Sequence, residues 1–208
     1  MKNELIVLLL CLVCFAQPAL AYRPFYTEDA GVAGKGVFQT EMSWDYYKWK
    51  NGDSDQIYLL VAPIYGPTED IELSAEIPYV IHKITDGPTT EGIGDINLVA
   101  KYVFLWDNYQ TKDALFTMKG IVKLDSGDYL KGIGRGDVEY SLVPVFSKVI
   151  NKRLTIHGQF GYSWVADRKN PDLRDYAFYG AAADYALTEP LHIVGEFTES
   201  LNPDKTLG

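Results

Sequence analysis

The 208-residue chain has few cysteines, an excess of acids over bases, and no apolar run long enough for a membrane-spanning helix. Its 2 cysteines, Cys11 and Cys14, both lie close to the N-terminus. Lys and Arg number 19 against 28 Asp and Glu, so the formal net charge is -9. This balance argues against nucleic acid or another polyanion as a partner. The longest later apolar run, Ile57–Tyr65, has the length of a strand.

The first 21 residues have the pattern of an export signal. A lysine precedes the apolar stretch Leu5–Phe15, and a short Ala-x-Ala site follows it. This apolar stretch is too short to remain as a helical anchor. We therefore expect a signal peptide at 1–21, cleavage between Ala21 and Tyr22, and one domain over 22–208. Cleavage removes both cysteines, so the mature chain has no thiolate ligands or disulfides. We expect no cofactor and no metal.

What the sequence has in quantity is aromatic residues, glycine and alternating polarity. Aromatic residues make up 13% of the chain, and there are 18 glycines. Segments of about ten residues with period-two alternation recur along it, separated by polar breaks. The predicted strands are Gly36–Lys48, Gln56–Tyr65, Ile71–His82, Gly92–Trp106, Asp113–Lys123, Gly134–Lys148, Arg153–Val165, Asp175–Leu187 and Leu191–Glu199.

The length of these strands and of the breaks between them favours a barrel that crosses a membrane. The breaks alternate between long and short, as external loops and periplasmic turns do in transmembrane barrels. In the fourth strand one face is apolar; it comprises Ile96, Leu98, Ala100, Tyr102, Phe104 and Trp106. The predicted fold is an all-β, antiparallel up-and-down transmembrane β-barrel with nine strands in this chain. Bacterial barrels close with even strand numbers, so we expect truncation at Gly208 and a full-length barrel of about 10–12 or more strands.

Several motifs resemble one family. Arg23–Gly31, Gly92–Ile96, Lys123–Asp128 and Gly136–Tyr140 are similar to segments of the outer-membrane transporter family associated with the meta-pathway of phenol degradation. Asp125-Ser126 stands where the family usually has a proline-threonine pair. The resemblance implies an outer-membrane barrel, passage of small and often hydrophobic compounds, and further strands beyond Gly208. It supplies no catalytic residues.

If the apolar faces meet lipid, the opposite faces line the lumen. The predicted pore-lining residues are Glu41, Asp45, Glu72, Glu76, Asp95, Asn97, Lys101, Lys119, Lys123, Arg135, Asp137, Glu139, His157, Gln159, Asp184 and Glu196. The acids outnumber the bases, which favours cations or neutral polar solutes. The alternative is that these groups pair with one another and fill a narrow barrel that conducts nothing.

Two enzymatic interpretations are weak. His157 or His192 with Ser163 and Asp137 has the residue types of a hydrolase, but residue types without geometry carry little weight. The glycine-rich Gly92–Asp95 and Gly132–Asp137 precede strands, whereas a phosphate loop precedes a helix.

We therefore expect a non-enzymatic channel or transporter in the outer membrane of a Gram-negative bacterium. Its partners would be lipid and a small-molecule solute. A non-conducting structural or surface-binding barrel is the alternative. The oligomeric state is left open.

Overall fold

The computed structural model describes residues 26–49, 54–107, 113–166, 169, 171, 173–188 and 191–201. The expected signal peptide lies outside these residues. The strands are β1 (Phe38–Lys48), β2 (Ser54–Tyr65), β3 (Ile71–Lys83), β4 (Thr89–Ile93), β5 (Asn97–Trp106), β6 (Ala114–Lys123), β7 (Val138–Asn151), β8 (Leu154–Ala166), β9 (Tyr176–Ala186) and β10 (His192–Leu201). A 3-10 turn, η1 (Tyr129–Lys131), precedes β7. In the described part of the chain, no helix is both long and apolar enough to cross a membrane.

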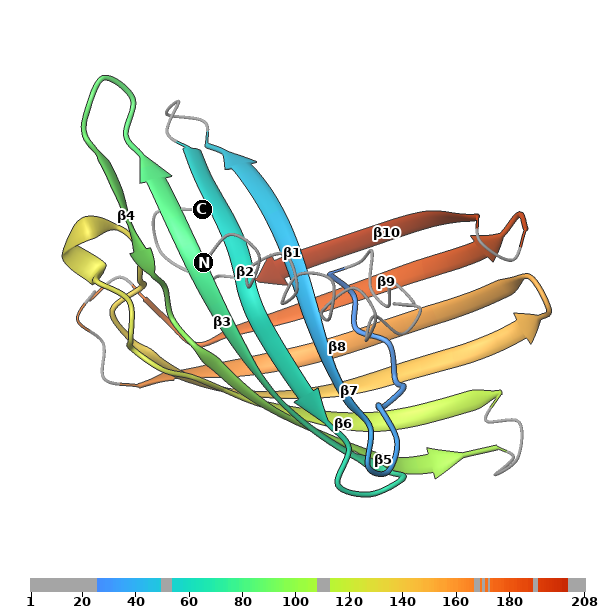
Figure 1. Ribbon diagram of the computed structural model, residues 1–208. Coiled ribbons are helices and arrows are strands. Elements are labelled where there is room, and N and C mark those ends of the chain that lie inside the picture. The colour runs from blue at the N-terminus through green and yellow to red at the C-terminus, as the bar shows by residue number, and fades with distance from the viewer. Residues whose placement is uncertain are drawn as a thin grey trace, which may run out of the picture.

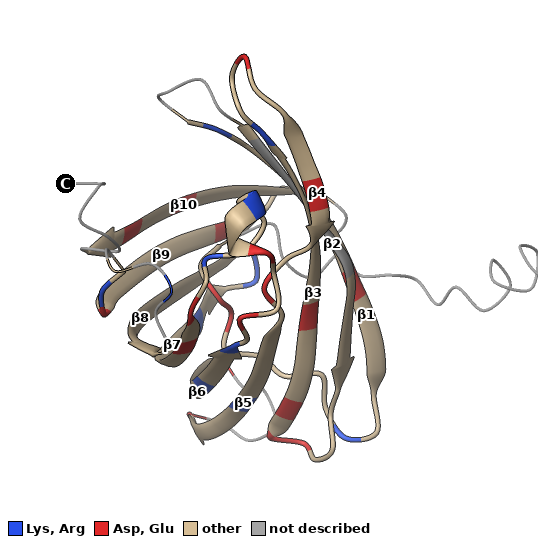
Figure 2. Ribbon diagram, turned by 90° about the vertical axis from the view of Figure 1, so that its left-hand side faces the viewer, with Lys and Arg blue, Asp and Glu red and all other residues tan. Residues whose placement is uncertain are grey.

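The strands form one antiparallel, up-and-down sheet. The order is β1-β2-β3-β5-β6-β7-β8-β9-β10, and β4 pairs only with the end of β3. The sheet curls into an open half-barrel, with β1 to β3 on one side and β8 to β10 on the other (Figures 1 and 2). β1 and β10 are the two edges of the described sheet. The predicted all-β, antiparallel barrel architecture is confirmed.

The predicted fourth strand is in fact two strands. β4 forms a hairpin with the C-terminal part of β3, where Tyr79 is opposite Ile93. β5 pairs with the N-terminal part of β3, where Glu76 is opposite Asn97. The chain leaves the sheet between them because the Asp95 carboxylate accepts hydrogen bonds from distant backbone amides, of Gly127 at 2.9 Å and of Arg135 at 2.8 Å.

A β-bulge corrects the predicted facing at the end of β5. The register shifts between Val103 and Leu105, so Trp106 becomes the partner of Leu115. Leu115 packs against the buried cluster inside the curve. Trp106 therefore lies on the face opposite to that of Leu98, whereas simple alternation placed the two together.

The breaks keep the expected alternation only in part. From β3 onward, long segments at 84–96, 124–137 and 167–175 alternate with shorter ones at 107–113, 152–153 and 187–191. The connections 49–53 and 66–70 are equally short, so the rule is wrong for the first pair.

The sheet buries polar side chains and exposes apolar ones, which is the reverse of the distribution in water-soluble proteins. In β5, Lys101 is 1% exposed while its neighbour Tyr102 is 54% exposed. Large apolar side chains are exposed along the convex face; they include Leu73, Leu98, Phe104, Tyr140, Leu142, Phe160 and Trp164. A water-soluble domain would bury this surface and expose its lysines.

Candidate functional site on the concave face

The cross-strand register collects predicted pore-lining residues into rows. Directly opposed residues of antiparallel strands share a face. One row runs through Glu72, Lys101 and Lys119 on β3, β5 and β6. A second runs through Glu76, Asn97, Lys123 and Glu139 on β3, β5, β6 and β7.

These rows face the inside of the curve. Residues from both halves of the sheet contact one short stretch of chain, which only the inner face of a curved sheet allows. That stretch is residues 26–37, called the N-terminal segment below, and it is the blue trace preceding β1 in Figure 1.

The N-terminal segment is held mainly through its backbone by side chains of the wall. The amide of Glu28 donates to Gln159 Oε1 at 2.9 Å. The amide of Ala30 donates to Ser147 Oγ at 2.8 Å, and Thr117 Oγ1 donates to the Ala30 carbonyl at 2.5 Å. Residues 26–33 of the segment thus form a layer inside the sheet, whereas Gly36 and Val37 make backbone hydrogen bonds to Gly66 beside β2.

The two ends of the segment reach opposite parts of the wall. The amide of Ala33 donates to Glu72 Oε2 on β3 at 2.8 Å. The amides of Tyr26 and Thr27 donate to the carboxylate of Glu196 on β10. Near β1, the Tyr26 hydroxyl donates to Asp45 at 3.3 Å and contacts the Tyr47 hydroxyl. The segment therefore crosses the concave face from β3 to β10.

At the centre of this face, one carboxylate bridges two lysines. Glu28 Oε1 accepts from Lys101 Nζ at 3.3 Å, and Glu28 Oε2 pairs with Lys119 Nζ. Lys101 Nζ also donates to the carbonyl of Asp29 at 3.0 Å. Glu28 and both lysines are at least nine-tenths buried. Removing one partner from such a site leaves uncompensated charge, which is costly.

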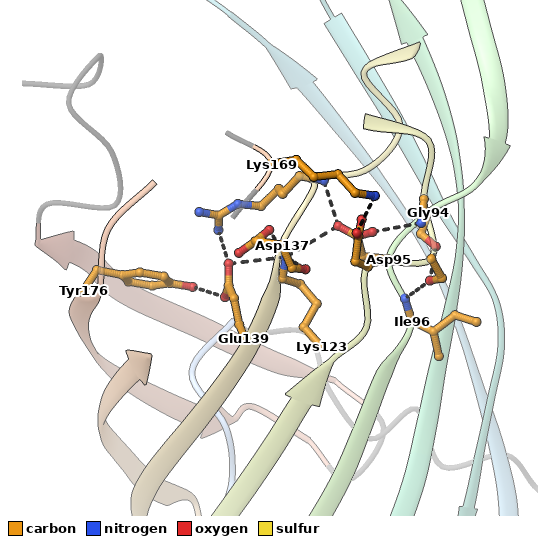
Figure 3. A network of polar contacts seen from close by, with 12 residues as sticks. Gly94, Asp95, Ile96, Lys123, Asp137, Glu139, Lys169 and Tyr176 are labelled. Carbon is orange, nitrogen blue, oxygen red and sulfur yellow. Dashed lines mark hydrogen bonds and ion pairs between the residues drawn. The ribbon is translucent and has the colours of Figure 1, made fainter. Parts of the chain in front are cut away.

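A second polar cluster, the loop network, lies where the loops between the strands meet (Figures 2 and 3). Lys123 Nζ is at its centre, at 2.6 Å from Asp137, 3.4 Å from Glu139 and 3.5 Å from Asp95. Asp137 is fully buried. The network joins the glycine–aspartate motifs that are well separated in the sequence.

The outer part of the network holds Glu139. Its carboxylate pairs with Arg135 at 2.9 Å and accepts from the Tyr176 hydroxyl at 3.0 Å. The Arg135 guanidinium also lies 5.7 Å from the centre of the Tyr176 ring. The loop that carries Arg135 and the first residues of β7 and β9 are thereby fixed to one another.

Glycines let the loops of the network approach closely. A Cβ at Gly134 would stand 2.7 Å from backbone atoms of Gly127, closer than real Cβ atoms come. Ser126 Oγ accepts from the Ile96 amide and donates to the Gly94 carbonyl, both at 2.9 Å. These motifs are structural junctions, as their position ahead of strands indicated.

Two charged surface residues beside the loop network, Lys169 and Asp128, have shifted pKa values. A hydrogen bond to the Asp125 carboxylate, at 2.5 Å, raises the pKa of Lys169. A hydrogen bond from Lys131 lowers the pKa of Asp128. The Lys131–Asp128 pair is exposed at both ends, so it contributes little to stability, whereas the Asp125 side chain is only 15% exposed.

The remaining predicted residues are dispersed. Asp184 Oδ1 lies 2.6 Å from His192 Nδ1 near the open edge. Glu41 and Asp45 are half-buried on β1. Glu76 Oε2 accepts a hydrogen bond from Asn97 Nδ2, in the side chain, at 2.8 Å.

The hydrolase residues are not brought together. His157 Nδ1 contacts Ser147 Oγ at 2.7 Å, and Ser163 Oγ contacts Ser141 Oγ at 2.6 Å. His157 and Ser163 are six positions apart on one strand, which is roughly 20 Å. Within the described residues, no cluster of three or more His, Cys, Asp or Glu is suited to a metal ion.

Reasoning from the sequence missed Thr117 and Ser147, which hold the N-terminal segment by hydrogen bonds to Ala30. It also missed Glu28, the residue of the segment that pairs with Lys101 and Lys119. Thr117 and Ser147 have the inward parity of their strands, so their facing was accessible. Glu28 precedes the first strand, and its role has no periodic signal.

The structure is an antiparallel half-barrel with a charged concave face and an aliphatic and aromatic convex face. This defines a β-barrel protein whose polar side chains point inward and whose apolar side chains point outward. A family model described as "Putative MetA-pathway of phenol degradation" matches residues 21–208, and the chain belongs to this family. This confirms the resemblance that the motifs indicated. Among curated proteins, no sequence matches the chain.

Proposed function

We propose that the protein is a non-enzymatic outer-membrane β-barrel that lets small molecules pass. The observation that carries this proposal is the inverted distribution of polarity. A sheet that buries Lys101 and Glu72 while exposing Tyr102 and Phe104 is suited to lipid outside and water inside. Charged walls of this kind select solutes in channels.

The proposal includes export to the outer membrane of a Gram-negative bacterium. The signal pattern of residues 1–21 and the expected cleavage between Ala21 and Tyr22 support it. The family description connects the protein with phenol degradation. Small, hydrophobic or aromatic molecules are therefore the solutes we propose.

One observation favours a second function, a barrel that conducts nothing. The N-terminal segment lies across the concave face and takes up polar groups that would otherwise line the passage. In this alternative the segment is a permanent filling, and the barrel serves as a structural or surface-binding module.

Swelling of proteoliposomes should separate the two functions. Vesicles that contain the full-length protein and an impermeant polysaccharide should swell faster than protein-free vesicles in an isotonic solution of a phenyl glycoside, an aromatic solute too polar to cross lipid unaided. A neutral trisaccharide supplied at the same osmolarity is the control for leaks, and it should cause little swelling. Equal rates with and without the protein would support the non-conducting barrel.

The lipid-facing assignment predicts different effects for neighbouring residues. Leu98→Arg should cost up to about 2–4 kcal/mol of folding free energy in lipid vesicles, the range for a charge placed against hydrocarbon near the bilayer midplane. Asn97→Arg is the matched control, since Asn97 contacts Glu76 on the concave face and an arginine there meets an acid. A urea titration of folding into vesicles measures both. Equal losses would contradict the assignment of faces.

A further inference from the structure

We infer that Lys101 and Lys119 form a binding site for small organic carboxylates, and that Glu28 fills this site in the structure. The inference deepens the proposed function and rests on it, since a lumenal site receives ligands only if small molecules enter the lumen. The ligand class is a monocarboxylate with a compact apolar body.

The charged half of the site is a pair of cross-strand neighbours. Lys101 on β5 and Lys119 on β6 are directly opposed in the ladder, so their ammonium groups converge on one point. Two adjacent buried ammonium groups repel each other and require an anion. Glu28 supplies one oxygen to each of them, which is the arrangement that any carboxylate could reproduce.

The apolar half of the site lies beside the lysines. Val143 is opposite Lys119 in the ladder, and Val143 and Val145 pack against Ala30. Leu115, Ile121 and Phe178 flank this cluster. A ligand with a carboxylate and an apolar body would therefore replace both Glu28 and Ala30.

The occupant can leave without breaking the sheet. The hydrogen bonds of Glu28, Ala30 and Ala33 to the wall are made by side chains of the wall, and water can replace them. The segment turns at Gly34 and Gly36, whose φ angles of 83° and 74° fall in the left-handed region that favours glycine. Beyond this turn, Gly36 is anchored by donating to the Gly66 carbonyl at 2.7 Å.

Chemical rescue tests the site. Glu28→Gln keeps the shape of the side chain and removes the anion, so the variant should melt below the wild type in detergent micelles. Sodium benzoate at about 100 times its dissociation constant should raise the melting temperature of the variant by about 5–10 °C. Benzamide and sodium chloride at matched concentration should not. Equal rescue by chloride would overturn carboxylate recognition, and so would the absence of rescue.

The matched control removes the lysines as well. In the triple variant Glu28→Gln, Lys101→Met and Lys119→Met, benzoate should have no effect on melting. Rescue that persists in this variant would place benzoate elsewhere and overturn the inference.

A second measurement keeps Glu28 and both lysines, so it does not depend on folding of the charge variants. Ala30 is fully buried, and the expected mature chain has no cysteine, so Ala30→Cys provides a single protected thiol. Benzoate should accelerate its reaction with a maleimide, while Leu130→Cys, at an exposed position, should react at an unchanged rate. An unchanged rate at position 30 would overturn competition between benzoate and the segment.

Both measurements are made in micelles and require no passage. Solute passage without benzoate binding would overturn the site and keep the channel. Benzoate binding in a protein that passes nothing would keep the site and overturn the channel.

Discussion

Lys123→Met should lower the free energy of unfolding by about 3–5 kcal/mol at neutral pH. Lys123 is the cation shared by Asp95, Asp137 and Glu139, all of which are buried or nearly so. Methionine fills the space of the lysine stem but leaves three converging carboxylates in a poorly solvated place. Urea unfolding of the full-length protein from lipid vesicles, followed by tryptophan fluorescence, measures the loss.

The control is Lys148→Met. Lys148 pairs with Asp107 at 3.0 Å, but both side chains are more than a third exposed, so this variant should lose less than about 1 kcal/mol. Acid provides a second check. Without Lys123, the folded state favours protonated carboxylates more than the unfolded state does, so the deficit should shrink as the pH falls. Equal losses for the two variants, or a deficit that grows in acid, would contradict the role of Lys123.

Most strands and their facing could be predicted because alternation is a local signal. Leu98 and Tyr102 are exposed on one face while Lys101 is buried on the other, as the pattern in that stretch indicated. The same locality explains the errors. The break at Asp95 depends on amides of Gly127 and Arg135, which are 32 and 40 positions away in the sequence. The bulge that redirects Trp106 depends on pairing with β6.

The N-terminal segment was beyond this kind of reasoning. Its amide contacts join Tyr26 to Glu196 across 170 positions and Glu28 to Gln159 across 131. Contacts between a backbone and distant side chains impose no period on either partner. The sequence predicted an excess of inward acids that line an open pore. Two of these acids, Glu72 and Glu196, instead accept backbone hydrogen bonds from the N-terminal segment.

Deletion of Tyr26–Ala33 should raise single-channel conductance several-fold in planar bilayers. The deleted residues cross the concave face, so their removal widens the water-filled path there. It also removes Glu28 and Asp29 and leaves Lys101 and Lys119 in contact with water. Ion selectivity should therefore shift toward anions, and the shift should fade near 1 M salt, where the Debye length is about 3 Å. The deletion ends before Gly34, so the anchoring bond from Gly36 to Gly66 is kept.

A synthetic peptide distinguishes an emptied lumen from a damaged barrel. The peptide with the sequence of Tyr26–Ala33, added to the deletion variant, should reduce its conductance toward the wild-type level. The same peptide with glutamine in place of Glu28 should block less well, because it lacks the carboxylate that pairs with both Lys101 and Lys119. A damaged barrel would respond to neither peptide. Wild-type conductance in the deletion variant would mean that the segment does not obstruct the path, and equal block by both peptides would mean that the lysines do not hold it.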